Sequence, residues 1–164
     1  MLFRSKKETN SDATRSQESF LPIDNDGVLL PTKDFKQEDI PNFLIIYAQD
    51  VLASDYPKVG MTIADPQIVE AILLCRLINP LRNQKFPKLT SVYVYPSQEA
   101  GKGRWKLELT TKGGPRILWG SAPGHEANSE PLANVKLKRL VEVFIDSKLW
   151  SSPEVDLISP ASWK

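Results

Sequence analysis

Apolar and polar residues alternate along two stretches in the second half of the chain, and this alternation predicts a β-hairpin. Trp105, Leu107 and Leu109 alternate with polar neighbours, and the same spacing returns at Ile117 and Trp119. A period of two is typical of a half-buried strand. Two consecutive glycines between the stretches supply the turn, because glycine adopts a positive φ without a Cβ clash. We therefore predict two paired strands joined by a tight turn.

A long, mostly apolar segment before the hairpin predicts a buried helix. Between Gln67 and Asn79 only four residues are polar or charged. A helix that is apolar on most sides is largely buried. Asp65 is a suitable N-cap, Pro66 fits the first helical position, and Pro80 is expected to end the helix.

A second helix is predicted after the hairpin. Its apolar residues recur at i, i+3, i+4 and i+7 and define one face, made of Leu137, Leu140, Val141 and Phe144. Charged residues, Lys136 among them, fall mainly on other faces. Ser129 is expected to cap this helix, with Pro131 just inside it. We expect Trp119 and Leu140 to share one core, with the helix lying over the hairpin.

Further apolar segments predict the remaining strands. Residues 20–23 and 28–31 flank an Asp-Gly turn, which is a strong hairpin signal. Two more strands are expected within 42–48 and 89–95, and a short last strand at 155–158. The order of elements predicts an α+β fold, a mainly antiparallel β-sheet with two principal helices packed on it.

The first residues differ from the rest of the chain. Residues 1–18 are polar, charged and nearly free of apolar periodicity, so we expect a disordered tail there. Residues 19–164 are expected to form a single domain that buries a core without disulfides. The longest apolar run, 71–75, is far shorter than the about 20 residues that span a bilayer. We therefore expect no direct membrane insertion by this chain.

Composition and charge argue against several function classes. The 164 residues carry a net charge of +1, which argues against nucleic-acid or anionic-lipid binding through bulk charge. Cys75 is the one cysteine and His125 the one histidine, so neither an internal disulfide nor a histidine-rich metal site can form. We expect no cofactor, no metal site and no enzymatic activity. A hydrolase that uses His125 is the least supported hypothesis.

Two features are left as candidate binding sites. Trp105 and Trp119 lie on strands that should pair, so their rings form either a core beneath a helix or a platform on which sugar rings stack. The last strand, 155–158, is expected at an edge of the sheet. That edge is either inert, between Pro153 and Pro160, or it recruits a partner strand.

The order of these landmarks resembles the extracytoplasmic β domain of the FtsQ/DivIB cell-division proteins, over residues 19–159. The matching segments are 20–29 with its Asp-Gly turn, 41–47, the helix 65–79, the strands 89–95, 105–109 and 116–120, the helix start 136–140, and 155–158. Members of that family carry a transmembrane helix and a POTRA domain before the β domain, and neither fits into residues 1–18. Many members also have an arginine after the last strand, where this chain has Ser159.

The resemblance implies a scaffold of the bacterial division machinery, the divisome at the septum, and no catalysis. It implies a location on the outer side of the cytoplasmic membrane and binding to FtsB/FtsL-like coiled-coil proteins. The residues themselves also fit the cytoplasm. We therefore expect a non-catalytic protein-binding module that adds a partner strand at its C-terminal edge, Val155, Asp156, Leu157, Ile158 and Ser159. The alternative is a glycan- or peptidoglycan-binding domain that uses Trp105 and Trp119.

Overall fold

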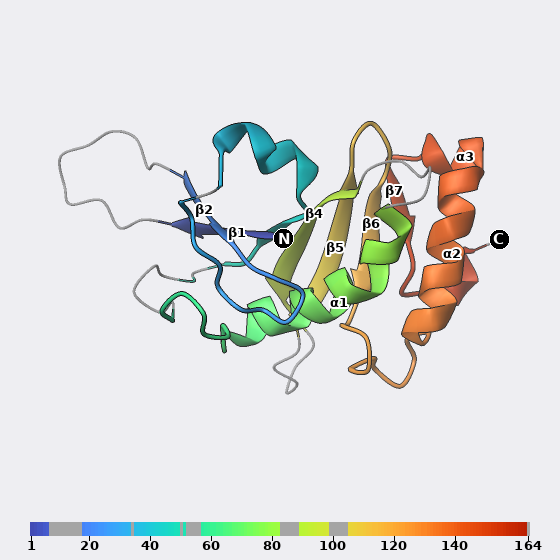
Figure 1. Cartoon of the computed structure of the whole chain (residues 1–164). Helices are drawn as coiled ribbons and strands as arrows, with labels where there is room; N and C mark the ends of the chain where they lie inside the picture. The colour runs from blue at the N-terminus through green and yellow to red at the C-terminus, as the bar shows by residue number, and fades with distance from the viewer. Residues whose placement is uncertain are drawn as a thin grey trace.

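A seven-stranded mixed sheet forms the centre of the protein (Figure 1). The computed structural model describes residues 1–6, 18–33, 35–49, 51, 57–82, 89–98 and 105–163. The strands, in the spatial order β2-β1-β3-β4-β5-β6-β7, are β1 (Leu2–Lys6), β2 (Glu18–Pro22), β3 (Ile45–Tyr47), β4 (Leu89–Pro96), β5 (Trp105–Thr111), β6 (Arg116–Gly120) and β7 (Glu154–Asp156). The helices are α1 (Pro66–Arg82), α2 (Ala133–Ile145) and α3 (Ser147–Trp150), with 3-10 turns η1 (Gln37–Asn42) and η3 (Pro160–Ser162).

Half of the strand pairs are parallel, so the prediction of a mainly antiparallel sheet is wrong. β1–β2, β4–β5 and β5–β6 pair antiparallel, whereas β1–β3, β3–β4 and β6–β7 pair parallel. α1 connects β3 to β4, and α2 connects β6 to β7. A helical crossover brings the chain back to the end of the sheet where the previous strand began, so the next strand runs parallel to it. The coarser expectation, a sheet with helices packed on it, is observed.

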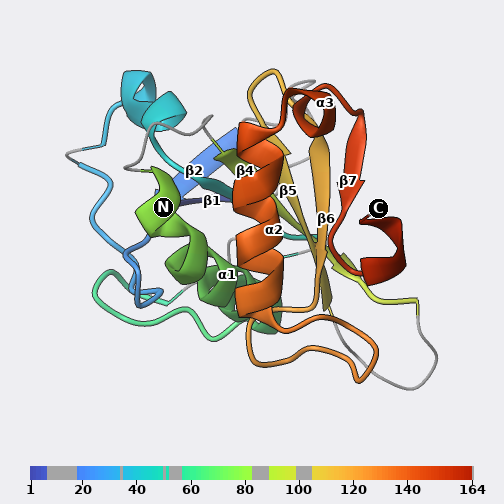
Figure 2. The same ribbon diagram turned by 90° about the vertical axis from the view of Figure 1, so that its right-hand side faces the viewer.

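α1 and α2 cover the same face of the sheet (Figure 2). α1 packs on β4 and β5. α2 contributes Leu140 and Val143, which are fully buried in the same core cluster as Trp119 of β6. The prediction that Trp119 and Leu140 share one core, under a helix that lies over the hairpin, is confirmed. We call the face of the sheet that points away from α1 and α2 the open face.

The buried side of α2 is rotated from the predicted one. Its fully buried residues are Lys136, Leu140 and Val143, whereas Leu137 and Phe144 are only half-buried. The apolar pattern alone pointed to the wrong side because it excluded a lysine from the core. Lys136 can be buried there because it forms an ion pair with the buried Glu130.

The start of α1 is as predicted. Oδ1 of Asp65 accepts hydrogen bonds from the backbone N–H groups of Gln67 at 2.9 Å and Ile68 at 3.3 Å, which is N-cap geometry. The helix does not end at Pro80 but continues to Arg82. Proline removes one backbone donor, yet its fixed φ near −65° is compatible with a helical turn.

The Asp-Gly turn is also present, but it joins a smaller hairpin than predicted. Asp24 donates its N–H to the carbonyl of Val28 at 3.1 Å, and its side chain accepts the N–H of Val28 at 2.9 Å. Beyond the turn only one bridge forms, between Ile23 and Leu29. The chain then pairs with the segment before α1 through a bridge between Val28 and Thr62.

The first residues are part of the sheet, so the predicted disordered tail 1–18 is wrong for residues 2–6 and for Glu18, which begins β2. β1 lies between β2 and β3, and Leu2 and Phe3 are completely buried. Two apolar residues are too few to show periodicity, and the order here comes from pairing with strands distant in sequence. Residues 7–17 of the expected tail lie outside the described residues.

Replacing Phe3 with alanine tests this correction. Because the Phe3 ring is 0% exposed, Phe3→Ala should lower the free energy of unfolding by about 3–5 kcal/mol. Denaturant unfolding measures the change, with Lys138→Ala, at an exposed position of α2, as the control. A change for Phe3→Ala as small as that of the control would place β1 outside the folded core.

Candidate functional site

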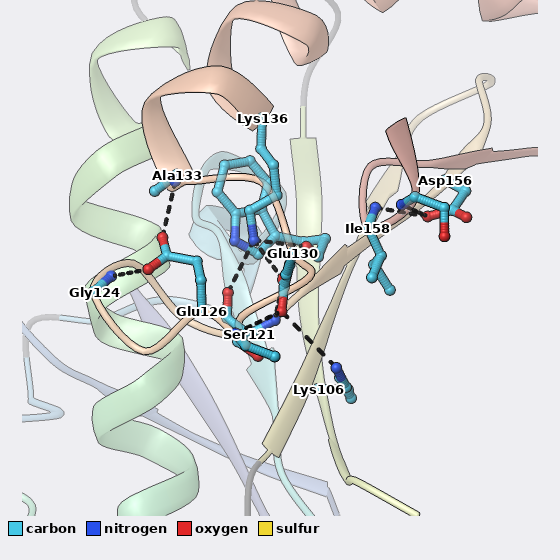
Figure 3. Close-up of polar contacts among 12 residues, drawn as sticks. Lys106, Ser121, Gly124, Glu126, Glu130, Ala133, Lys136, Asp156 and Ile158 are labelled. Carbon is cyan, nitrogen blue, oxygen red and sulfur yellow. Dashed lines mark hydrogen bonds and ion pairs between the residues drawn. The ribbon is translucent and has the colours of Figure 1, made fainter. Parts of the chain in front are cut away.

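β7 is the last strand of the sheet and pairs with β6 alone among the described strands. It spans Glu154–Asp156, so the predicted strand 155–158 is too long. Oδ1 of Asp156 accepts the N–H groups of Ile158 at 2.6 Å and Ser159 at 3.2 Å (Figure 3). This side-chain turn bends the chain away from the strand. Of the five predicted edge residues, Ile158 and Ser159 therefore belong to a turn.

The backbone of β7 presents only a short open edge. The carbonyl of Pro153 accepts the N–H of Arg116 at 3.0 Å, and Leu157 donates its N–H to the carbonyl of Leu118 at 2.9 Å. Since backbone groups alternate along a strand, those of Glu154 and Asp156 face outward. The outward carbonyl of Asp156 accepts the indole N–H of Trp163 at 2.8 Å.

What is left of the edge is the N–H and C=O of Glu154 and the N–H of Asp156. Pro153 lies directly before these groups, and η3, which begins at Pro160, lies after them. The sequence left two alternatives open, an inert edge between prolines and an edge that recruits a partner strand, and the structure has features of both. Prolines flank the edge and the C-terminal turn occupies one acceptor, but three backbone groups face outward between them.

Charged side chains gather on the open face beside this edge. Arg116 forms an ion pair with Glu154, and its Nε lies 3.5 Å from Oε1 of Glu108 on β5. Burial raises the pKa of the Glu108 carboxyl, the Glu154 carboxylate adds to this, and the Arg116 guanidinium opposes it. Two carboxylates therefore share one arginine next to β7.

A buried ion pair fixes the end of β6 against α2. The Lys136 side chain is 0% exposed and that of Glu130 is 1% exposed, and their charged atoms are 2.7 Å apart. Nζ of Lys136 also donates to the carbonyls of Trp119 at 3.0 Å and Ser121 at 3.2 Å. It lies 4.8 Å from the centre of the Trp119 ring, within cation–π range. The ammonium thus has three oxygen acceptors and an aromatic face in place of water.

The Glu130 carboxylate is equally well satisfied (Figure 3). It accepts the N–H of Ser121 at 2.7 Å, and Lys106 lies 3.9 Å away. Burial by itself would raise the pKa of Glu130, but the hydrogen bonds and charge of Lys136, together with Ser121, hold it below its usual value. Burial lowers the pKa of Lys136, and the charge of Glu130 offsets part of that effect.

Gly120 makes room for this pair. Its φ is +89°, and a Cβ at this position would lie 2.2 Å from Oε1 of Glu130. The register between β5 and β6 also shifts here, between Leu107 and Glu108. Glycine is therefore required at Gly120 both for its backbone conformation and for the close approach of Glu130.

A glutamate in the preceding loop, not Ser129, satisfies the start of α2. The N-cap position is Leu132, which makes no side-chain cap bond. Instead, Oε1 of Glu126 accepts the N–H of Ala133 at 2.8 Å, and its Oε2 accepts the N–H of Gly124 at 3.0 Å (Figure 3). The predicted Ser129 cap is wrong because the loop folds back and brings Glu126 to the helix end.

His125 and the two tryptophans are not part of β7, although Trp119 lies on the neighbouring strand β6. Nδ1 of His125 is 2.6 Å from Oε1 of Glu70 on α1, so this half-exposed histidine ties the loop to the helix. Trp119 is fully buried, whereas Trp105 is half-buried against the core. A sugar-stacking platform that needs both rings is therefore not present, and the core interpretation of Trp119 is correct.

Sequence reasoning missed a hollow on the open face. Tyr47 and Tyr93 stack with ring centres 4.5 Å apart, Tyr95 continues the stack, and the Arg4 guanidinium lies over Tyr47. A pocket of about 280 Å³ lies where β3 ends. Its lining consists of Arg4, Tyr47, Ala48, Gln49, Val51, Tyr93, Val94 and Tyr95. Tyr93 and Tyr95 share one face because side chains alternate along β4, and Tyr47 joins them because the parallel register of β3 and β4 sets it opposite Tyr93.

Within the described part of the chain, no group of three or more histidine, cysteine, aspartate or glutamate side chains is placed to hold a metal ion. No helix among the described residues is both long and apolar enough to cross a membrane. In the comparisons with known proteins, no family model, no curated protein and no solved structure matches this chain. The fold and the site therefore stand on their own geometry.

Breaking the buried pair should cost far more than breaking a surface pair. Lys136→Met leaves the Glu130 carboxylate buried without its cation, which should lower the free energy of unfolding by about 3–5 kcal/mol. The control is Lys36→Met, because Lys36 pairs at 3.6 Å with Glu38 and the two side chains are 73% and 76% exposed. Denaturant unfolding compares the two variants, and equal losses would contradict the assignment of the Lys136–Glu130 pair as the buried constraint.

The low pKa of Glu130 predicts a specific loss of stability in acid. A carboxyl whose folded-state pKa lies below its unfolded value stabilises the fold above that unfolded value, about 4.3, and loses this contribution as pH falls through the folded pKa. The difference in unfolding free energy between wild type and Glu130→Gln should therefore shrink below about pH 4.3. Thermal melts between neutral and acidic pH measure it. A difference that stays constant on acidification would mean that ionised Glu130 is not the stabilising species.

Proposed function

We propose that this protein is a non-catalytic protein-binding scaffold module whose β7 edge accepts a strand from a partner. The observation that carries the proposal is the outward-facing N–H and C=O of Glu154 and N–H of Asp156, at the end of the sheet. Strand addition uses such groups for affinity and alternate side chains for specificity. The edge is held rigidly, because β6 behind it is fixed by the Lys136–Glu130 pair.

The placement of β7 also depends on α3. Asp146 caps this short helix by accepting the N–H of Lys148 at 2.8 Å. The ring of Trp150 lies against Gly114 in the β5–β6 turn, where a Cβ would come within 2.2 Å of the indole. The chain therefore enters β7 from a point anchored on the hairpin, and the outward groups of β7 have a defined position before any partner arrives.

The biological setting that we propose is bacterial cell division, with FtsB/FtsL-like coiled-coil proteins as partners. It is supported by the order of segments in the sequence, which resembles that of the FtsQ/DivIB β domain, and by the position of β7 as the last strand of the sheet. The glycan-binding alternative loses support, since Trp119 is buried.

Proline substitution at Asp156 tests strand addition. Proline has no N–H to donate, and the N–H of Asp156 points outward, so Asp156→Pro should abolish pairing without removing a bond to β6. The probe is a synthetic peptide from the C-terminal part of an FtsB-like protein, and calorimetric titration measures its Kd. We expect binding by wild type and its loss in a variant that a thermal melt shows to be folded.

Asp156→Ala is the matched control, because it removes the same side-chain turn with Ile158 but keeps the backbone N–H. It should still bind the peptide, more weakly than wild type only because it lacks the Asp156 carboxylate. Leu157→Pro, by contrast, removes the N–H that bonds Leu118 and should destabilise the fold. If folded Asp156→Pro binds as tightly as Asp156→Ala, strand addition at β7 is wrong. If wild type does not bind the peptide at all, the cell-division partner is wrong.

A further inference from the structure

The open edge of β7 carries an excess of negative charge on one face. Val155 and Leu157 are buried toward the helices, with 8% and 0% exposure, so Glu154 and Asp156 lie on the open face. Glu108 lies two strands away on the same face, since it pairs with Leu118, and Leu118 pairs with Asp156. Near the edge, this face therefore carries three carboxylates, those of Glu108, Glu154 and Asp156, and one guanidinium, that of Arg116.

Two further cations in this part of the protein are engaged elsewhere. Arg139 of α2 pairs with Glu142 and lies over the ring of Trp163, whose indole N–H bonds the Asp156 carbonyl. Lys106 lies on β5 opposite Tyr95, and its ammonium is directed toward Glu130, 3.9 Å away, at the end of the sheet. Arg116 is already shared between Glu108 and Glu154. Asp156 uses Oδ1 for the N–H groups of Ile158 and Ser159. A further cation placed beside Glu154 and Asp156 would balance the excess negative charge at the edge.

We propose that the strand that adds to β7 carries lysine or arginine on the open face of the sheet, opposite Glu154 and Asp156, and an apolar residue on the other face, beside Val155. This inference rests on the proposed function and names the chemistry of the partner. Side chains directly opposite each other on neighbouring strands have Cβ atoms about 4.5–5.5 Å apart, within reach of an ion pair.

The same charges argue against a second copy of this chain as the partner. Pairing β7 with β7 of another molecule would bring Glu154 and Asp156 of one chain next to those of the other. Like charges directly opposite each other destabilise a strand pair. The edge therefore favours a basic strand of a different protein.

Three synthetic eight-residue peptides test the proposal on the full chain. Each alternates valine with one other residue, which is lysine, serine or glutamate. Backbone amide chemical shifts of Glu154 and Asp156 report the site of binding, and the titration gives Kd. We expect the lysine peptide to bind at least about fivefold more tightly than the serine peptide, and the glutamate peptide to bind most weakly. The preference should decrease at high salt, because surface charges are screened.

Charge reversal provides the second arm. Glu154→Lys should invert the order, so that the glutamate peptide binds more tightly than the lysine peptide, in a variant that a thermal melt shows to be folded. Glu38→Lys, at an exposed position of η1, which leads into β3 at a distance of four strands from β7, is the matched control and should leave the order unchanged.

The outcomes separate the two proposals. If all three peptides shift the β7 amides with equal affinity, strand addition stands and the basic preference is overturned. If lysine-peptide binding leaves the β7 amides unshifted, or if Glu154→Lys does not change the order, the peptide is recognised elsewhere and the preference is likewise overturned. If no peptide binds, both the preference and the strand-addition function fail.

Discussion

The ion pair between Lys136 and Glu130 is the constraint on which the C-terminal half of the fold depends. Removing two charges from water costs several kcal/mol per ion, and an imperfect pair would not recover it. Here the ammonium has three oxygen acceptors and the face of Trp119, and the carboxylate holds both Lys136 and the N–H of Ser121. One interaction thus joins the end of β6, the following loop and the first turns of α2. Since β7 pairs only with β6 in the described sheet, its position depends on the same contact.

The helix and the strand of this arrangement could be predicted from the sequence, but the contact between Lys136 and Glu130 could not. The helix 133–145 could be predicted from its period, yet the buried stripe is Lys136, Leu140 and Val143 and not the most apolar stripe. Lys136 was assigned to solvent because lysine is almost never fully buried without a partner. Its partner, Glu130, lies in a loop outside any periodic element. The one signal that could have pointed to it is Gly120, whose lack of a side chain leaves space for that carboxylate.

The strand directions and β1 were predicted wrongly for a similar reason, because they depend on contacts between distant parts of the sequence. Strand positions at β4, β5 and β6 were predictable because alternation is local, and the turn glycines confirmed the hairpin. Strand direction is set by what connects the strands, and α1 and α2 each turn their flanking strands parallel. β1 was missed because Leu2 and Phe3 show no period of their own and are ordered only by pairing with β2 and β3. In each case the deciding contact joins residues far apart in the sequence.

The shortness of the β7 edge determines how it can be specific. Trp163 takes the outward carbonyl of Asp156, and Pro153 precedes the strand, so a partner finds one acceptor and two donors. Three backbone hydrogen bonds, each with a net contribution of about 0.5–1.5 kcal/mol, would barely offset the cost of ordering an added strand. Backbone hydrogen bonds also do not distinguish one partner sequence from another, because every non-proline residue offers the same groups. Selectivity must then come from the side chains beside the edge, and there the sheet presents Glu154 and Asp156 on one face and the apolar Val155 on the other. An edge this short protects the protein from indiscriminate strand pairing, while its charges decide which strand can overcome that protection.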